Sequence, residues 1–145
     1  MSGWNDNKRK GTAWEFAFYA RALKEGLDVF LPCGDHLPQD CIVVNGAGTV
    51  FKVQIKGTST KAVSSHKNSK IERYKVVAAG GSNSKTPIDC TKVDVVACYI
   101  LPLDLWYIIP CLALNNAVSV WFSPNYEETK SKFEVYKESW DYFKC

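Results

Sequence analysis

Two stretches decide the fold of this chain: Pro38-Gln39-Asp40-Cys41-Ile42-Val43-Val44 and Thr49-Val50-Phe51-Lys52-Val53-Gln54-Ile55-Lys56. They predict two short β-strands, and the turn formers Asn45-Gly46-Ala47-Gly48 between them predict a hairpin. Side chains alternate between the two faces of a strand, so the second stretch has an apolar face and a polar face. We therefore expect the apolar face in a core and the polar face in a cleft, with Asp40 beside Gln54 and Lys56.

The length and composition of the chain predict one domain that spans residues 1–145. Hydrophobic residues make up 46% of the sequence and charged residues 23%, which is typical of a globular protein with a buried core. The net charge of +3 permits a nucleic-acid partner without demonstrating one. The polar segment Met1 to Lys10 lacks the apolar region of a signal peptide, and no apolar run approaches membrane-spanning length. We therefore expect a soluble, cytoplasmic protein without a membrane partner.

The cysteines give little support for a zinc site, because none of the six forms a CxxC pair. Cys41 and Cys98 lie inside apolar strand patterns, where a free cysteine acts as a small hydrophobic residue. In an intracellular protein the thiols are normally reduced. We therefore expect reduced cysteines rather than disulfides.

Helical periodicity occurs near both ends of the chain. The first helix is predicted from Lys10 to Glu25, after a flexible arm over residues 1–8, and Gly26 is a good residue to end it. Its apolar stripe follows the i, i+3, i+4 rule and consists of Ala13, Phe16, Ala17, Ala20 and Leu23. A second helix is predicted from Glu127 to Phe143, with an aromatic stripe for core packing formed by Phe133, Tyr136, Trp140 and Phe143.

Five further segments predict β-strands: residues 28–31, 73–78, 93–100, 105–109 and 118–122. The nearly continuous apolar run over 93–100 is typical of a central strand buried on both faces. Residues 105–109 are its expected hairpin partner, and residues 118–122 an edge strand. The order of elements predicts an α/β fold with a central mixed β-sheet flanked by helices.

Asp40, Gln54 and Lys56 form the strongest candidate site. The Asp40 carboxylate and the Gln54 amide oxygen are hard oxygen ligands for Mg²⁺, and the Ile55 backbone carbonyl could complete the inner shell. Lys56 would orient the attacking water and offset phosphate charge. An ordinary structural role also accounts for these residues: Asp40 would cap the turn after Pro38, and the other two would form a solvated strand face.

Glu15 has two interpretations of similar weight. It lies on the helix flank beside the apolar stripe, from where it could reach the same cleft and hold the metal or its water. The segment Thr12-Ala13-Trp14-Glu15 also fits the capping-box pattern, in which the glutamate returns to the helix N-terminus. The local sequence leaves both open.

The motifs occur in the order Gly11-Thr12-Ala13, Glu15-Phe16-Ala17, Leu31-Pro32, Asp40 and Val53-Gln54-Ile55-Lys56-Gly57-Thr58-Ser59. This order resembles the PD-(D/E)XK nuclease superfamily. It is most similar to small single-domain members, which include archaeal-type Holliday junction resolvases and a group I intron homing endonuclease. The resemblance covers residues 10–60, extends more weakly to residues 93–110, and implies a restriction-endonuclease-like core.

The resemblance implies a metal-dependent DNA endonuclease that hydrolyses phosphodiester bonds with a Mg²⁺-activated water, with Mn²⁺ as a substitute. Asp40, Gln54, Ile55 and Glu15 would hold the metal, and Lys56 would complete the catalytic set. Cutting both DNA strands would require a homodimer or a higher symmetric homo-oligomer, because one chain carries one site.

Gln54 departs from the family pattern, since most members carry Glu or Asp at this position. An amide oxygen still binds Mg²⁺, with weaker electrostatic attraction. The intron-homing branch of the family is known for Q-x-K, so the departure is compatible with activity. The alternative is a catalytically silent nucleic-acid-binding or assembly module on the same fold.

Cations and hydroxyls border the proposed cleft and are candidates for contacts with the phosphate backbone. They are Lys8, Arg9, Lys10, Lys52, Thr58, Ser59 and Lys61. Small clusters of this kind also occur as plain solubilising surface.

Overall fold

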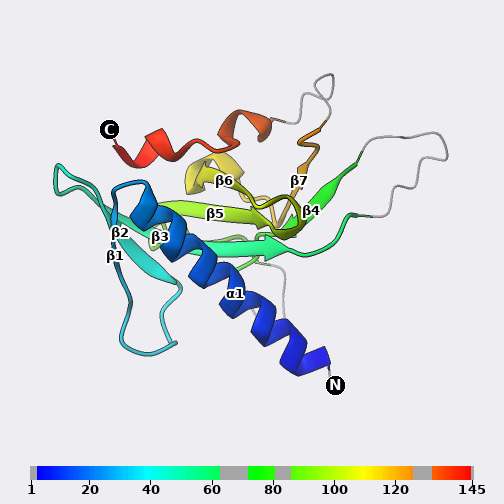
Figure 1. Cartoon of the computed structure of the whole chain (residues 1–145), viewed down its shortest axis with the longest axis horizontal. Helices are drawn as coiled ribbons and strands as arrows, with labels where there is room; N and C mark the ends of the chain where they lie inside the picture. The colour runs from blue at the N-terminus through cyan, green and yellow to red at the C-terminus, as the bar shows by residue number, and fades with distance from the viewer. Residues whose placement is uncertain (1–2, 63–71, 81–85, 126–131, 145) are drawn as a thin grey trace.

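One long helix crosses a five-stranded mixed sheet (Figure 1). The computed structural model describes residues 3–62, 72–80, 86–125 and 132–144. The strand order is β1-β2-β3-β5-β6, with β3 and β5 parallel and the other neighbours antiparallel. The helix and the strands of this sheet are α1 (Gly3–Lys24), β1 (Asp28–Phe30), β2 (Cys41–Val44), β3 (Val50–Thr58), β5 (Val95–Ile100) and β6 (Leu105–Pro110).

A second, two-stranded antiparallel sheet is formed by β4 (Tyr74–Val77) and β7 (Ser119–Phe122). The predicted edge strand over 118–122 therefore exists, but it pairs with β4 outside the central sheet. Four 3₁₀ turns complete the described elements: Leu101–Leu103, Cys111–Leu114, Glu134–Tyr136 and Trp140–Lys144. The predicted α/β fold with a central mixed sheet is confirmed, with α1 as the one α-helix of the described residues.

Strand β5 divides the core into two apolar clusters. All six of its residues are buried, as the sequence predicts for a central strand, and alternate side chains point to opposite faces. Val95, Ala97 and Tyr99 join a cluster with α1 and the aromatic residues of the C-terminal segment. Val96, Cys98 and Ile100 join a second cluster with β4 and β7. The central sheet is therefore covered on both faces, and free Cys98 packs as a small hydrophobic residue, as expected.

Helix α1 begins at Gly3 rather than Lys10, so residues 3–8 belong to the helix instead of the expected arm. Its core-facing side also differs from the predicted stripe. Phe18 and Ala22 are fully buried, whereas Phe16 is 64% and Leu23 58% exposed. Phe18 packs against Trp106 and Trp140, with ring centroids 5.3 and 5.4 Å away, and such aromatic contacts bury more area than the alanine-rich stripe.

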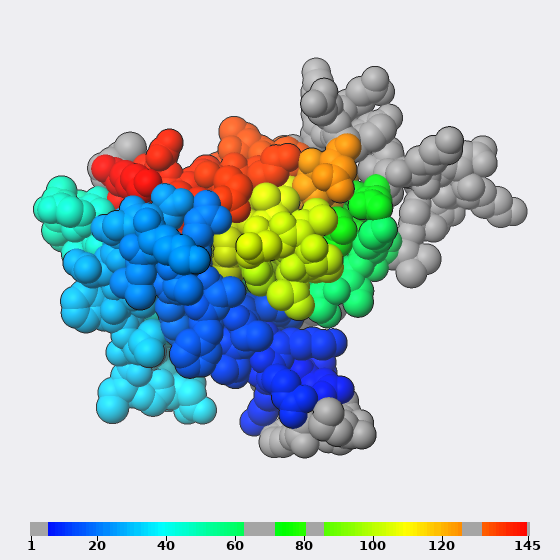
Figure 2. Space-filling view, in the orientation of Figure 1, coloured from blue at the N-terminus to red at the C-terminus, as the bar shows by residue number. Residues whose placement is uncertain are grey.

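The exposed side of α1 runs along the surface seen in Figure 2, where the blue helix covers the middle of the molecule. Within the described residues, no helix is both long enough and apolar enough to cross a membrane.

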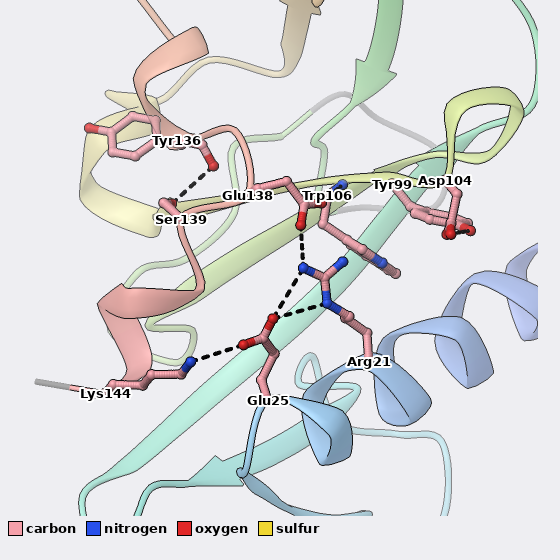
Figure 3. Close-up of polar contacts among 9 residues, drawn as sticks. All are labelled: Arg21, Glu25, Tyr99, Asp104, Trp106, Tyr136, Glu138, Ser139 and Lys144. Carbon is pink, nitrogen blue, oxygen red and sulfur yellow. Dashed lines mark hydrogen bonds and ion pairs between the residues drawn. The ribbon is translucent and has the colours of Figure 1, made fainter.

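The predicted C-terminal helix is wrong for the described residues 132–144, and residues 126–131 lie outside the description. Two 3₁₀ turns occupy this segment, separated by extended Lys137 and by Glu138 with a φ of 51°. Long-range bonds explain the interruption. One Glu138 oxygen accepts a 2.8 Å hydrogen bond from the Trp106 N–H, and the other binds the Arg21 guanidinium (Figure 3). The aromatic residues still serve the core, since Phe133, Trp140 and Phe143 are buried.

The expectation that all cysteines are reduced is wrong for one pair. Cys90 and Cys111 form a disulfide, with their Cα atoms 5.6 Å apart. Cys33, Cys41 and Cys98 are free, and Cys145 lies outside the described residues. The disulfide joins the segment before β5 to the turn after β6. Its partners are 21 residues apart in sequence and carry no spacing signal that distinguishes them from the other cysteines.

Candidate active site

Asp40 immediately precedes β2, at the end of the pairing between β2 and β3. Its backbone N–H donates a 2.9 Å hydrogen bond to the Val53 carbonyl. Its carboxylate Oδ2 accepts a 2.6 Å bond from the Ile55 N–H. The side chain thus takes the place of a strand partner for β3. The hairpin register, with Cys41 opposite Val53, puts Asp40 beside Gln54, as the sequence predicts.

The alternation predicted for β3 is present. Val53 and Ile55 are buried, and Lys52, Gln54 and Lys56 are half-buried on the other face. The Gln54 side-chain oxygen Oε1 is itself buried and accepts no hydrogen bond within the described part of the chain. A buried amide oxygen without a donor is costly, and native structures normally satisfy such atoms. Gln54 Oε1 is therefore placed to accept a ligand.

The Ile55 carbonyl is on the same side of β3 as Asp40. In an antiparallel ladder the N–H and C=O of one residue point to the same neighbouring strand. The Ile55 N–H points to the Asp40 carboxylate, and β2 ends at Cys41. The Ile55 carbonyl is thus directed to the space beyond the end of β2, beside the carboxylate.

Glu15 reaches this region from α1. The helix is seated closely on β3, because a Cβ added to Gly57 would lie 2.5 Å from the Trp14 ring. Glu15 is half-buried and interacts electrostatically with Asp40. The capping-box interpretation does not hold, since α1 begins at Gly3 and Thr12 lies inside the helix.

Burial disfavours the charged form of both carboxylates. Burial raises the pKa of Asp40 above its ordinary value, although the Ile55 N–H and the Lys56 ammonium oppose this shift. Burial, followed by the nearby Asp40 charge, raises the pKa of Glu15. Both shifts have the sign expected for partly buried acidic groups. A cation between them would reverse that penalty.

Three pockets open around these side chains. One of about 220 Å³ is lined by Glu15, Tyr19 and Asp40. A second, of about 470 Å³, is lined by Glu15, Lys56 and Lys75. A third, of about 630 Å³, is lined by Gln54 and Lys92. Each of the four candidate catalytic residues therefore borders a space that is open to a ligand.

The donor set fits a hard divalent cation. Among the described residues, no group of three or more His, Cys, Asp or Glu side chains is arranged to hold a metal. A metal at this position would therefore use amide and carbonyl oxygens as well as the carboxylates of Asp40 and Glu15. Mg²⁺ and Mn²⁺ accept such oxygen ligands. The unsatisfied Gln54 Oε1 is the observation that favours this fit.

The predicted DNA-contact residues are placed unevenly. Lys8, Arg9 and Lys10 are exposed along the N-terminal half of α1, where Arg9 pairs with Asp6 at 3.8 Å. Lys52 lies on the Gln54 face and donates a 3.2 Å bond to the Thr91 carbonyl.

The remaining three predicted residues lie at or after the end of β3. Thr58 lines the 470 Å³ pocket, and Ser59 beside it is half-buried. Lys61 forms a 2.6 Å ion pair with Glu72. The structure thus brings Lys52 and Thr58 next to the candidate site and engages Lys61 elsewhere.

Sequence reasoning missed Tyr19, Lys75 and Lys92. Tyr19 lines the smallest pocket, and burial together with Glu15, Cys41 and Asp40 raises its pKa above the ordinary value. It follows Glu15 by four residues, so helical spacing alone could have placed both on one face. Lys75 and Lys92 come from segments distant in sequence, for which no local signal exists.

Comparisons with known proteins bear on the family and the fold. A family model described as PD-(D/E)XK endonuclease matches residues 5–141. Among solved structures, the bacterial homing endonuclease I-Ssp6803I is similar, with a TM-score of 0.71 and 25% sequence identity, over 93% of this chain and 88% of that chain. No curated protein matches the chain. The resemblance inferred from short motifs is thus confirmed and extends over most of the sequence.

Proposed function

The chain belongs to the PD-(D/E)XK endonuclease family, and on this premise we propose that it is a metal-dependent DNA endonuclease that hydrolyses phosphodiester bonds. The similarity to a bacterial homing endonuclease supports DNA as the substrate. One observation supports the metal dependence: Gln54 Oε1 is buried and has no hydrogen-bond partner among the described residues, on a strand whose hairpin register brings Gln54 next to Asp40 in the fold. An amide oxygen and a carboxylate are hard ligands that suit a divalent cation, and enzymes of this family typically use divalent metals.

We assign the metal-binding role to Asp40, Gln54, the Ile55 carbonyl and Glu15, with Mg²⁺ as the natural ion and Mn²⁺ as a substitute. The two carboxylates supply the negative charge that the neutral amide does not. A bound divalent ion would offset the charge of the phosphodiester and make a coordinated water more acidic. The neutral Gln54 therefore lowers the affinity for the metal, but Asp40 and Glu15 still supply two negative charges.

Lys56 acts on the phosphate and on the water. It follows Gln54 by two residues on the same face of β3, and its charge acts on Asp40. Within the described residues it forms no ion pair with a carboxylate. Its ammonium is thus available to bind a non-bridging phosphate oxygen and to orient the attacking water.

Cleavage of both strands of a duplex requires two such sites. Each chain contributes one, so we propose a homodimer or a higher symmetric homo-oligomer. A single chain would nick one strand.

Metal binding gives the decisive experiment. Calorimetric titration with Mn²⁺ should show binding to the wild-type protein, and Asp40→Asn should abolish it while the protein stays folded. Asp28→Asn is the matched control, because Asp28 is exposed on β1 outside the candidate site. Absence of metal binding by the wild type would refute the enzyme and favour a silent nucleic-acid-binding module.

Cleavage can be tested without knowing the target sequence. Genomic DNA incubated with the protein and Mg²⁺ should acquire new ends at recurrent positions, which sequencing of the ends detects. Asp40→Asn and Lys56→Ala should each produce none. New ends at the wild-type level in both variants would show that these residues do not form the active site.

A further inference from the structure

The outer face of the β4–β7 sheet is exposed beside the candidate site. Paired residues of an antiparallel sheet project to the same face, and the pairs Lys75–Trp121 and Val77–Ser119 form this outer face. Val77 is 47% and Trp121 44% exposed. The opposite face, with Tyr74, Val76, Val120 and Phe122, is buried in the core. Figure 2 shows the neighbouring green and orange surfaces of these strands at one side of the molecule.

This face is continuous with the proposed cleavage site. Lys75 and Val77 line the same 470 Å³ pocket as Glu15 and Lys56. The pocket is therefore bounded by candidate catalytic residues on one side and by β4 on the other. Within the described residues, neither Lys56 nor Lys75 is paired with a carboxylate. Two lysines thus line one pocket whose lining includes a single acidic residue.

Trp121 lies against Lys75 and restrains it. The Lys75 Nζ atom lies 5.7 Å from the centre of the Trp121 ring, within the range of a cation–π interaction. A lysine held in this way loses less side-chain entropy when it binds an anion. The pair is therefore prepared for a phosphate rather than left as two independent surface residues.

We propose that this outer face is a DNA-binding surface that continues from the cleavage site, with Lys75 binding a backbone phosphate near the scissile one and Trp121 as its positioning residue. The inference rests on the proposed function. Successive phosphates of one strand advance about 3.4 Å along the duplex axis. A DNA strand with one phosphate at Lys56 therefore places its neighbouring phosphates near β4, which carries Lys75 on the other side of the pocket. A two-stranded ribbon also fits the major groove.

The salt dependence of DNA binding tests this role. Binding to a mixed-sequence duplex without divalent metal is dominated by phosphate contacts, so no recognition sequence is needed. Lys75→Gln should reduce the slope of log Kobs against log salt by about 0.9, the value for one phosphate. With this slope, the ratio of wild-type to Lys75→Gln affinity should be roughly eightfold larger at 0.1 M salt than at 1 M salt. Lys75→Arg should retain the wild-type slope.

Two further variants make the result specific. Lys24→Gln removes an exposed lysine at the far end of α1 and should change the slope much less than Lys75→Gln does. Trp121→Leu should lower affinity, and Trp121→Phe, which keeps an aromatic ring, should restore most of it. Far-ultraviolet circular dichroism of each variant confirms folding.

The outcomes separate this inference from the proposed function. If the wild type binds duplex DNA and Lys75→Gln has the same slope as Lys24→Gln, the DNA-binding role of Lys75 is refuted while the endonuclease proposal stands. If the wild type binds Mn²⁺ but Lys75→Gln alters only its self-association, the outer face of the β4–β7 sheet is a protein interface and the inference is wrong. Failure of the wild type to bind Mn²⁺ refutes the proposed function itself.

Discussion

The Asp40 carboxylate accepts a 2.6 Å hydrogen bond from the backbone N–H of Ile55, so a side chain replaces the strand partner that β3 loses where β2 ends. This bond sets the direction of the carboxylate and leaves its other oxygen available for a ligand. It also directs the Ile55 carbonyl to the same space. The geometry of the candidate site therefore follows from where a hairpin stops pairing, rather than from the catalytic side chains alone.

Metal affinity should fall as the pH is lowered, beginning above the ordinary range of carboxylates. The pKa values of Asp40 and Glu15 are raised above 3.8 and 4.5, and both groups must lose their protons to bind a cation. Calorimetry in buffers of different ionisation enthalpy should therefore detect proton release on Mn²⁺ binding at mildly acidic pH. If Mn²⁺ binding releases no protons at pH values above the ordinary carboxylate range, the proposed ligand set is contradicted.

The stability of the metal-free protein should change in the opposite direction. A raised folded-state pKa means that the folded protein holds more protons than the unfolded chain, so stability is greatest below the unfolded pKa and falls as the pH rises through the folded pKa. Asp40→Asn removes the ionisable group, and with it the Asp40 contribution to this pH-dependent loss of stability. Its unfolding midpoint should therefore decline less with rising pH than that of the wild type, as thermal denaturation without metal can measure.

Gln54→Glu should strengthen metal binding and weaken the metal-free fold. The new carboxylate adds a full charge next to a divalent ion, and even at an intermediate dielectric constant this is worth several kcal/mol, of which desolvation removes part. We expect an affinity gain of at least about tenfold by Mn²⁺ calorimetry. Without metal, a third carboxylate near Asp40 and Glu15 should lower the unfolding midpoint. Equal affinity in both proteins would exclude Gln54 as a ligand.

The hairpin and its site could be predicted because they depend on local alternation. Val53 and Ile55 are apolar and Gln54 and Lys56 polar, and only one register buries the first pair. The face of α1 could not be predicted in this way, because Phe16 and Phe18 lie on different sides and both sides carry apolar residues. Which side of α1 is buried depends on Trp106 and Trp140, which are distant in sequence and contact Phe18.

The C-terminal segment shows the same limit. Its aromatic spacing is helical, but the Glu138 carboxylate binds Arg21 and the Trp106 N–H, which lie 117 and 32 residues away. These bonds hold Glu138 at a φ of 51°, which is incompatible with a continuous α-helix. Lys144 and Glu25 add a further 2.9 Å ion pair between this segment and α1 (Figure 3). No local pattern predicts a helix break that is caused by partners so far along the chain.

Gly57→Ala should destabilise the protein and disturb the site. An added Cβ would lie 2.5 Å from the Trp14 ring, so the ring, or the helix that carries it, would have to shift, at a cost of about 1–3 kcal/mol. Glu15 follows Trp14 and would move with it, and Mn²⁺ affinity should fall as well. Gly46→Ala is the control, because nothing lies within 4 Å of its added Cβ. Chemical denaturation and calorimetry measure the two effects, and a neutral Gly57→Ala would show that the helix is not seated as described.

Asn45 links the hairpin turn to the C-terminal segment, and Asn45→Ala should loosen both. Its Nδ2 donates a 2.8 Å bond to the Phe143 carbonyl, and its Oδ1 accepts bonds of 3.0 and 2.9 Å from the N–H groups of Ala47 and Thr49. Because Asn45 is 6% exposed, its removal leaves buried partners unsatisfied, at a cost of about 2 kcal/mol or more. Asn7→Ala, on the exposed surface of α1, should be neutral or slightly stabilising. Urea denaturation should therefore separate the two variants, and Mn²⁺ affinity should stay near the wild-type value in both, since Asn45 lies at the opposite end of β2 from Asp40.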